Sequence, residues 1–234
     1  MPERDWNAHY AENQIPWDTG RPDEMLVGLV EGRERQRVDG LRALEIGCGT
    51  GANARWLAQR GFDVVACDLA PLAIEAAAAG LAGLPDDTTG RCRFHVHDFL
   101  AEDLPSDSAG PFDLVFDRGV FHVFDDAGTQ ADFAARVSAL LQPGGLWASL
   151  LGSTEGPDRN HGPPRRSLRD IASAVEPSLE IVEVRRHAFA ANIPTEAAAW
   201  WMIARARRVI AQPSTGQAGP VSYTHLTLPT IYAV

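Results

Sequence analysis

A glycine-rich stretch near residue 50 has the clearest potential for ligand chemistry in this sequence. It reads LEIGCGTG over residues 44–51 and includes Gly47, Cys48, Gly49 and Gly51. Glycines permit a positive φ and let backbone N–H groups approach a bound molecule closely. The spacing also fits the G-x-G-x-x-[G/A] pattern of dinucleotide-binding loops. Because three glycines can also form a bare tight turn, the loop alone does not identify its ligand.

Acidic residues at three successive strand ends narrow the choice of ligand. Glu45 precedes the loop, where its charge suits a cationic group and would be poorly placed beside a pyrophosphate. Asp68 ends the next apolar run, about twenty residues on, where an acid can accept from both hydroxyls of a ribose. Asp98 ends a third run and can accept from an adenine amino group, with Phe99 flanking the ring. Each acid alone could be a helix cap, but the set favours ligand binding.

A second group follows the fourth predicted strand. Asp117 is placed to contact a cofactor or a substrate, Arg118 to orient an anionic acceptor, and His122 to act as a base. The alternatives are a structural salt bridge for Arg118 and a packed ring for His122.

Other polar and aromatic residues give weaker signals. The loop over residues 152–166 is placed to cover an active site or to lie in solvent; its candidate residues are Asn160, His161, Arg165 and Arg166. His95 and His97 share a strand face, which mimics a metal pair. No third ligand is evident, so we predict no metal. Trp200 and Trp201 are expected to pack in the core.

The elements that position these residues alternate between strands and helices. Strands are predicted at 42–46, 63–67, 93–97, 112–117, 146–151, 179–189 and 198–205, and helices at 22–35, 52–60, 71–79, 131–141 and 167–175, the last with a capping box from Ser167 and Asp170. Pro143, Gly144 and Gly145 are expected to break the chain before the fifth strand. Such alternation predicts a parallel sheet with helices on both faces and the strands' carboxyl ends along one edge. The last two strands suggest an antiparallel pair that closes the sheet.

The composition of the chain limits the classes of protein to which it can belong. The chain has 234 residues and a formal net charge of -10, which disfavours nucleic acid as a substrate. No apolar run is long enough to cross a bilayer, and the amino terminus is too polar for a signal peptide. Three cysteines without a CxxC pair favour a cytoplasmic location. We therefore expect a small-molecule partner, no nucleic acid, no membrane and no obligate protein partner.

Taken together, the motifs resemble those of the class I S-adenosylmethionine-dependent methyltransferases over about residues 40–210. The matching segments are LEIGCGTG, VVACDLAP, VHDF, FDLVFDRGVFH and LLQPGGLW. The resemblance implies an α/β fold: a Rossmann-like, mostly parallel seven-stranded sheet with helices on both faces and an antiparallel last strand. It also implies that S-adenosyl-L-methionine is the cofactor and is bound by Trp17, Glu45, Gly47, Cys48, Gly49, Gly51, Asp68, Leu69, Asp98, Phe99 and Asp117. By the same likeness, the acceptor lies near Arg118 and His122.

Within that superfamily, the PWDTG segment at residues 16–20 and the FDRG segment at 116–119 resemble the thiopurine and thiol S-methyltransferase group. The likeness implies that residues 1–40 cover the cofactor, with Trp17 packing over it, and that the acceptor is a small thiol or a related sulfur or selenium nucleophile. Residues 41–210 would form the methyltransferase domain.

Residues 211–234 form a tail without charged residues, and we expect it to be disordered or foreign to the native protein.

Two other functions stay open at this point. A NAD(P)-dependent oxidoreductase would share the glycine loop, but a Tyr-x-x-x-Lys pair is impossible because the chain has no lysine. A non-catalytic protein that binds S-adenosylmethionine would share every motif.

Overall fold

The computed structural model describes residues 5–32, 39–89, 91–156, 162–192 and 197–207. The strands are β1 (Arg42–Ile46), β2 (Asp63–Asp68), β3 (Cys92–Val96), β4 (Phe112–Arg118), β5 (Leu141–Gly152), β6 (Leu179–Phe189) and β7 (Ala197–Ala206). The helices are α1 (Trp6–Ala11), α2 (Glu24–Glu31), α3 (Ala52–Gln59), α4 (Pro71–Ala79), α5 (Asp86–Thr89), α6 (Ala127–Leu140) and α7 (Leu168–Val175), with a 3-10 turn, η1 (Phe121–Val123).

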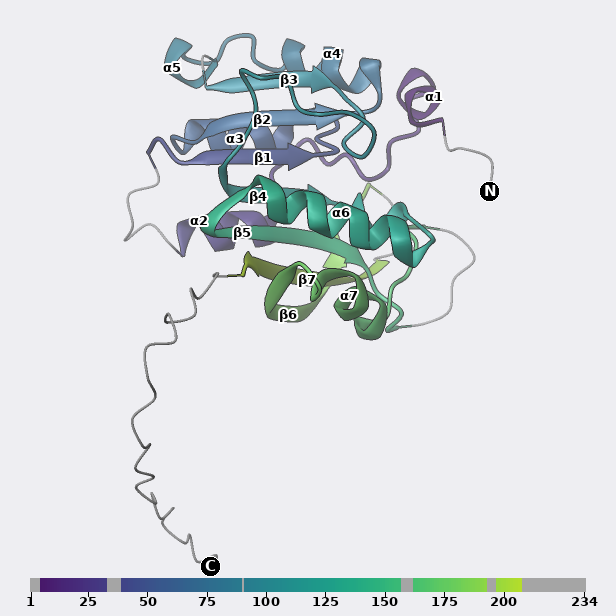
Figure 1. Cartoon of the computed structure of the whole chain (residues 1–234). Helices are drawn as coiled ribbons and strands as arrows, with labels where there is room; N and C mark the ends of the chain where they lie inside the picture. The colour runs from purple at the N-terminus through teal and green to yellow at the C-terminus, as the bar shows by residue number, and fades with distance from the viewer. Residues whose placement is uncertain (1–4, 33–38, 90, 157–161, 193–196, 208–234) are drawn as a thin grey trace, which may run out of the picture.

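All seven strands form one sheet in the order β3-β2-β1-β4-β5-β7-β6 (Figure 1). β7 runs antiparallel to both of its neighbours, whereas the pairings among the first five strands are parallel. The predicted mostly parallel, seven-stranded sheet with an antiparallel last strand is therefore confirmed. The strand order reverses between β1 and β4, and ligands of such sheets bind outside the carboxyl ends of the strands at this point.

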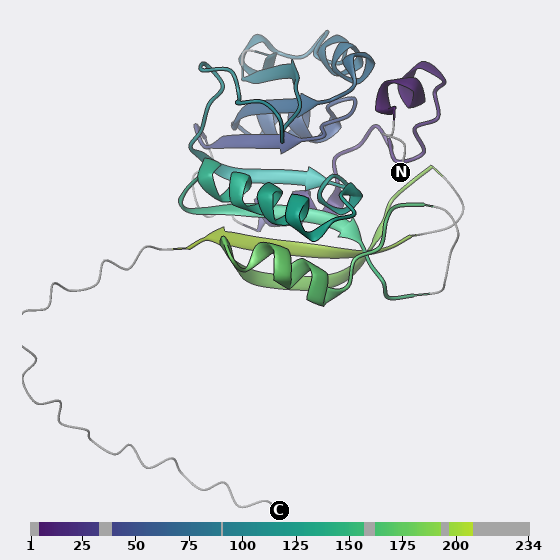
Figure 2. The same ribbon diagram turned by 45° about the vertical axis from the view of Figure 1, so that its right-hand side comes forward.

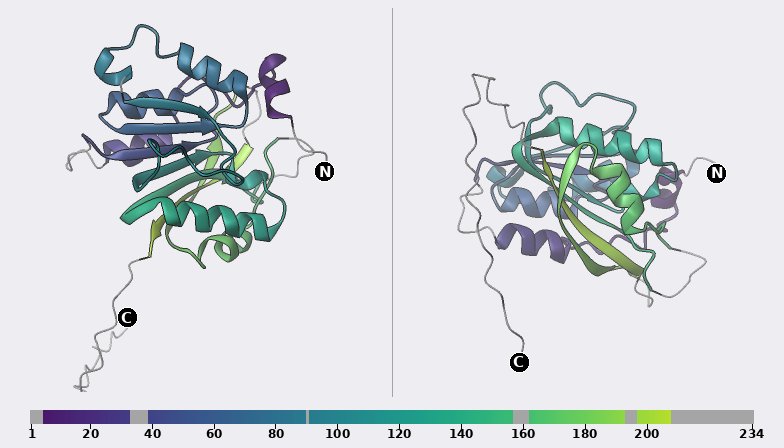
Figure 3. Two further views of the ribbon diagram at one scale, coloured as in Figure 1. Left: turned by 45° about the horizontal axis from the view of Figure 1, so that its top comes forward. Right: turned by 60° about the horizontal axis from the view of Figure 1, so that its bottom comes forward.

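Helices cover both faces of the sheet, as predicted. α6 and α7 lie on one face, and α2 and α3 lie on the other (Figures 1 and 3). β1 shows why both layers form, because Leu44 and Ile46 belong to one buried cluster and Ala43 to the other. A strand buried on both faces needs small or apolar side chains at successive positions. This makes the buried acid at Glu45 an exception that needs its own explanation.

The ends of several helices follow local capping rules. Ser167 and Asp170 form the predicted capping box of α7. The carboxylate of Asp126 accepts the Thr129 N–H, so α6 begins at residue 127, four residues before its predicted start. The short helices α1, α5 and η1 were not predicted, since each is too short to show a helical repeat of apolar residues.

The expected break at residues 143–145 is wrong. These residues lie within β5, whose pairing with β4 jumps from Phe112–Leu141 to Leu114–Leu146. The extra residues of β5 form an irregularity in the ladder, where a proline without an N–H is tolerated.

The carboxyl ends of the parallel strands gather at one edge of the molecule. α1 lies beyond this edge, beside α4 (Figures 1 and 2). Among the described residues, no helix combines the length and the apolar character that crossing a bilayer requires.

Candidate functional site

The glycine loop connects β1 to α3 and has a backbone that only glycine adopts easily. Gly47, Gly49 and Gly51 have φ values of 66°, 54° and 77°. A Cβ on Gly47 would lie 2.2 Å from a methyl group of Val120. A Cβ on Gly51 would lie 2.8 Å from the ring of Phe94. The loop therefore needs glycine both for its conformation and for its close contacts.

Asp68 joins the loop to the end of β2. Its Oδ2 accepts the N–H of Gly49 at 2.9 Å, and its Oδ1 accepts the N–H of Ala70 at 3.0 Å. Burial raises the pKa of Asp68, and these two backbone bonds oppose the rise. A carboxylate offers about four acceptor positions, so the pair of oxygens retains capacity for ligand hydroxyls. The side chain of Leu69 beside it is 51% exposed, which leaves an apolar surface at the same edge.

Glu45 is a buried acid beside the loop. It is 1% exposed, and its Oε1 accepts from Asn53 Nδ2 at 2.8 Å. Its Oε2 has no hydrogen-bond partner among the described residues. Burial raises the pKa of Glu45 to about 8, and the bond from Asn53 opposes this rise. The ligand-free carboxyl is therefore mostly protonated near neutral pH, and a nearby cation would favour its charged form whereas a nearby phosphate would oppose it.

Cys48 contributes through its backbone. Its N–H donates to the carbonyl of Cys67 at 2.9 Å. Burial raises the pKa of the Cys48 thiol well above its ordinary value, so the thiol stays protonated and is a poor nucleophile.

An aromatic cluster from the N-terminal segment lies against the loop. Trp17 contacts Trp6, His9 and Tyr10 edge-on, with ring centroids 5.5 to 6.5 Å apart. The position of a Cβ on Gly49 would lie 3.0 Å from the Tyr10 hydroxyl. Sequence reasoning did not assign Tyr10 to the site, although its spacing of four residues from Trp6 would place both on one helical face.

Polar contacts hold this segment in place. The N–H of Leu72, at the start of α4, donates to Asn7 of α1 at 3.0 Å. The hydroxyl of Thr50, within the glycine loop, donates to Asp18 at 2.7 Å. Asn192 and several residues between Asn13 and Gly20 line an open cavity of about 570 Å³. The segment thus lies across the loop, where it can limit the access of water.

The two candidate residues after β3, Asp98 and Phe99, have partners within the protein. Asp98 Oδ1 accepts the N–H groups of Leu100 and Ala101, at 2.9 and 3.1 Å, which is a turn-capping arrangement. The ring of Phe99 is buried in the core, 4.9 Å from that of Phe133. This ring gains free energy by packing in the core, and its contact with an adenine stays a prediction.

The two histidines in and directly after β3 have separate partners. His95 Nε2 is 2.9 Å from the hydroxyl of Ser108, and His97 Nδ1 is 3.2 Å from Glu102. Within the described residues no group of three or more His, Cys, Asp or Glu could hold a metal ion.

Asp117 is fully buried and fastens the turn after β4. Its Oδ1 accepts the N–H groups of Val120 and Phe121, and its Oδ2 accepts from Trp147 Nε1 at 2.9 Å. Burial raises the pKa of Asp117, and these hydrogen bonds oppose the rise. These bonds give the carboxylate a structural role, and its contact with a cofactor or substrate stays a prediction.

Arg118 is likewise bonded to the protein. Its Nε donates to Asp23 at 2.9 Å, its Nη1 to the carbonyl of Trp17 at 3.1 Å, and its Nη2 to that of Ala190. Its guanidinium also lies over the ring of Phe189. The geometry thus agrees with the structural salt bridge rather than with an arginine aimed at an acceptor.

His122 is a packed ring, 3% exposed and 5.6 Å from the ring of Phe189. Its Nδ1 accepts the N–H of Gly152 at 2.7 Å. A histidine that accepts at one nitrogen carries its proton on the other. The nitrogen that a base would use is therefore occupied, and the expected base role is not supported by this geometry.

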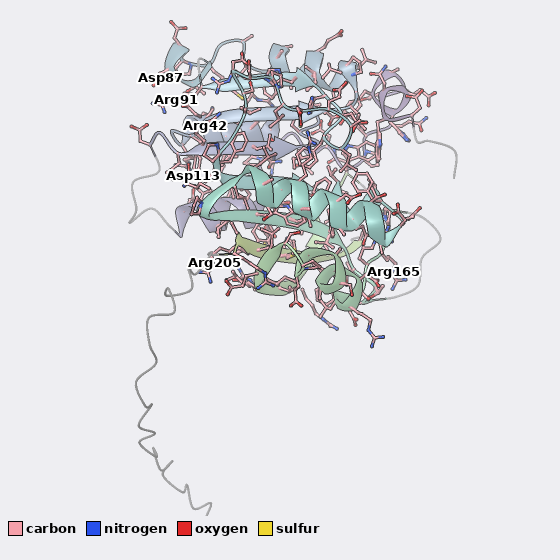
Figure 4. All side chains as sticks on the ribbon, viewed as in Figure 1. Arg42, Asp87, Arg91, Asp113, Arg165 and Arg205 are labelled. Carbon is pink, nitrogen blue, oxygen red and sulfur yellow. The ribbon has the colours of Figure 1, made fainter. Side chains whose placement is uncertain are left out.

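The loop after β5 is held by arginines. Arg165 and Arg166 donate to the backbone carbonyls of Ser153 and Phe124, and Arg166 pairs with Asp125 at 3.0 Å. Arg165 lies on the carboxyl side of the sheet, whereas Arg42 and Asp113 lie toward the opposite end of the strands (Figure 4). Asn160 and His161 lie outside the described residues.

Trp200 and Trp201 are buried, as predicted, with the Trp200 indole bonded to the carbonyl of Arg166.

Comparison with known proteins agrees with these features. The family model for thiopurine S-methyltransferase matches residues 1–197. A probable thiol methyltransferase 2 from Arabidopsis thaliana is 31% identical over 160 residues, covering 68% of this chain and 65% of that protein. A ubiquinone biosynthesis O-methyltransferase from Caulobacter sp. strain K31 is 36% identical over 118 residues, covering 50% of this chain and 42% of that one. The chain thus spans less than two thirds of the length of these relatives.

A solved structure gives the same fold. The 1,6-didemethyltoxoflavin-N1-methyltransferase of Burkholderia thailandensis, which holds S-adenosylhomocysteine, aligns with a TM-score of 0.66 at 20% identity. The alignment covers 87% of this chain and 86% of that one. Because the family model covers most of the chain, including the N-terminal segment and the glycine loop, the protein belongs to the thiopurine S-methyltransferase family.

Proposed function

We propose that this protein is an S-adenosylmethionine-dependent methyltransferase that acts on a small molecule. The observation that carries the proposal is the pairing of a glycine loop with the buried acid Glu45. The loop's three positive φ values define a tight, glycine-dependent turn at the ligand-binding edge of the sheet, and Glu45 retains an unpartnered oxygen. A site of this kind favours a ligand that carries a positive charge and no phosphate.

Several residues fit the proposed cofactor. The backbone of Gly47, Cys48 and Gly49 would receive its amino-acid end, and Asp68 its ribose hydroxyls. Leu69 would offer apolar contact to its adenine. When bound, the cofactor supplies a methyl group on a positively charged sulfur.

The chain's own contribution would be alignment and exclusion of water, which can lower a barrier by roughly 7–11 kcal/mol. Tyr10 and Trp17 lie where they can shield the loop from solvent. Because Arg118 and His122 are bonded to the protein, we expect neither to orient the acceptor or to act as the base.

We further propose that the acceptor is a small thiol or a related sulfur or selenium nucleophile. The thiopurine S-methyltransferase family model and the Arabidopsis relative support this class. This acceptor class also agrees with the chemistry of methyl transfer, since a thiolate is a good nucleophile near neutral pH and needs alignment more than proton transfer. The net charge of -10 speaks against nucleic acid. All three cysteines are free and buried, which favours a reducing cytoplasm.

The two other functions make different predictions. An oxidoreductase would have to bind a pyrophosphate next to Glu45, where the phosphates would raise the cost of ionising this buried carboxyl and could bind only beside its protonated form. A non-catalytic binding protein would bind the same cofactor without turnover.

A binding assay followed by a transfer assay tests the proposal. Calorimetry should show binding of S-adenosylhomocysteine and weaker or no binding of NADH. A radiolabelled methyl-transfer screen should then give product with aromatic thiols, hydrosulfide or selenium compounds. Tighter binding of NADH would contradict the cofactor. Turnover of amines, phenols or carboxylates alone would contradict the acceptor class while leaving the cofactor standing.

A further inference from the structure

The N-terminal segment is held through the backbone of one turn, Pro16–Asp18, which we name the cover turn. The carbonyl of Pro16 accepts the N–H of Asn192 at 2.7 Å. The carbonyl of Trp17 accepts from Arg118 at 3.1 Å, and the carbonyl of Asp18 accepts from the amide of Asn192. Three consecutive carbonyls are therefore bound by donors from the end of β4 and the segment after β6.

Arg118 has further partners that connect this turn to the rest of the edge. Its Nε pairs with Asp23, which also caps α2 through the N–H of Met25. The Arg118 and Asp23 side chains are 13% and 3% exposed, so the pair is largely removed from water. The Nη2 of Arg118 donates to the carbonyl of Ala190. A charge pair buried to this degree is stable only when its hydrogen bonds are well satisfied, which requires the cover turn to be in place.

The same chain of hydrogen bonds continues to the glycine loop. The N–H of Asp23 donates to Asn53 Oδ1 at 2.7 Å, and Asn53 Nδ2 donates to Glu45 at 2.8 Å. A second connection runs from Thr50 to Asp18 at 2.7 Å. The cover turn and the acid beside the loop are thus joined by two separate routes.

From these contacts we propose that Arg118 is a positioning residue that clamps the cover turn and, through Asp23 and Asn53, couples its docking to ligand binding at the glycine loop. Hydrogen bonds in one buried network reinforce each other. Ordering of the loop by a ligand and docking of the turn therefore stabilise each other, and the coupling is reciprocal. The inference rests on the proposed cofactor, and it gives Arg118 a task other than orienting the methyl acceptor.

The test compares Arg118→Ala with wild type in two measurements. Calorimetry should show S-adenosylhomocysteine binding weakened by about tenfold, as expected when a buried, bonded charge loses its partner. Deuterium exchange of the ligand-free proteins should become faster in residues 5–20 and 47–53 together. Arg118→Lys keeps the charge near Asp23 but lacks the forked donors, so it should restore only part of the affinity.

A matched control is Arg60→Ala. Arg60 pairs with Glu31 of α2 at 2.9 Å, and both side chains are about two-fifths exposed, at 41% and 42%. Its loss should leave affinity and exchange at the glycine loop unchanged.

Different results would contradict the clamp by Arg118 and the proposed cofactor binding. Wild-type affinity in Arg118→Ala with unchanged exchange at residues 47–53 would overturn the proposal, as would a rise in the acceptor's KM alone. If Arg118→Ala does not fold, Asp23→Asn removes the charge while keeping the shape and should weaken S-adenosylhomocysteine binding in the same direction. A wild-type protein that does not bind S-adenosylhomocysteine would contradict the proposed function instead, while the exchange measurements would still test the clamp.

Discussion

Three buried carboxylates at the edge of the sheet differ in how many hydrogen bonds they accept from the protein, and this difference indicates which of them can bind a ligand. Asp117 is bonded by three donors of its own fold. Asp68 is bonded twice by backbone, and Glu45 keeps one oxygen without a partner among the described residues. Since each buried carboxylate needs hydrogen bonds to remain charged, the less satisfied acids are the better candidates for ligand contact.

Asp68→Ala should weaken binding of S-adenosylhomocysteine without unfolding the protein. The carboxylate is proposed to bind ribose hydroxyls, and bonds to a charged group contribute about 1.5–3 kcal/mol each, so a loss of about tenfold or more is expected. Asp132→Ala, at an exposed position on α6, is the control and should bind as wild type. Equal calorimetric affinity of Asp68→Ala and wild type would remove Asp68 from the site.

Glu45→Gln should change how stability depends on pH. The folded pKa of about 8 lies above the ordinary value of 4.5, mainly because of burial; nearby Asp68 adds to the rise, and Asn53 and Arg55 oppose it. A raised carboxyl pKa contributes stability that is complete below pH 4.5 and is lost as pH rises through 8. Glutamine removes this loss, and the raised pKa values of Asp68 and Asp117 affect both proteins alike.

The melting temperature of ligand-free Glu45→Gln, relative to wild type, should therefore increase between pH 5 and pH 8.5. We expect a gain of at least about 3 °C across this range, which corresponds to roughly 1 kcal/mol for a domain of this size. Melting curves at several pH values measure it, and parallel pH profiles for the two proteins would show that Glu45 is not buried as described.

The loop from β1 to α3 depends on its neighbours as much as on its own sequence. Gly47 faces Val120 at the turn after β4, and Gly51 faces Phe94 of β3. The glycines thus let the loop lie close to the turn after β4 and to the ring of Phe94 in β3, and these contacts help to form the edge on which the site is built.

Gly47→Ala should destabilise the fold, with part of the loss recovered by Val120→Ala. The new Cβ would lie 2.2 Å from Val120, and a positive φ of 66° adds backbone strain. We expect a cost of about 1–3 kcal/mol from crowding, which the smaller partner relieves, while the strain remains. Denaturant unfolding of the two single variants and the double variant measures this. Strictly additive losses would mean that the two residues do not meet.

The whole molecule combines one sheet with a segment laid over its carboxyl edge. The sheet is buried on both faces by two separate clusters of apolar residues. The N-terminal segment instead rests on hydrogen bonds and edge-on aromatic contacts. Such contacts are weaker than a packed core, so the segment can respond to a ligand while the sheet stays unchanged.

Deleting residues 212–234 should leave the melting temperature and the affinity for S-adenosylhomocysteine nearly unchanged. This segment contains no Asp, Glu, Lys or Arg, and it follows the last predicted strand. Differential scanning calorimetry and a titration of the truncated protein test this. A fall in melting temperature of more than about 3 °C, the effect of roughly 1 kcal/mol, would show that the segment packs on the fold.

The sequence by itself determined the sheet, the loop and the order in which the acids reach the edge. Alternating apolar runs predicted all seven strands, and LEIGCGTG predicted a positive-φ turn between β1 and α3. These features depend on local periodicity and on the conformational freedom of glycine, which neighbouring residues encode. The predicted starts of α6 and β5 were wrong, because a helix cap at Asp126 and a bulge near Pro143 overrode the apolar pattern.

Only the tertiary structure decided which partners each polar side chain has. Arg118 lies 95 residues from Asp23, and His122 lies 30 from Gly152. Phe99 turned toward the core, and Tyr10 came to lie against Gly49. Nothing in the local pattern specifies such pairings, because they depend on how distant elements pack and on which donors remain unsatisfied after the backbone has bonded.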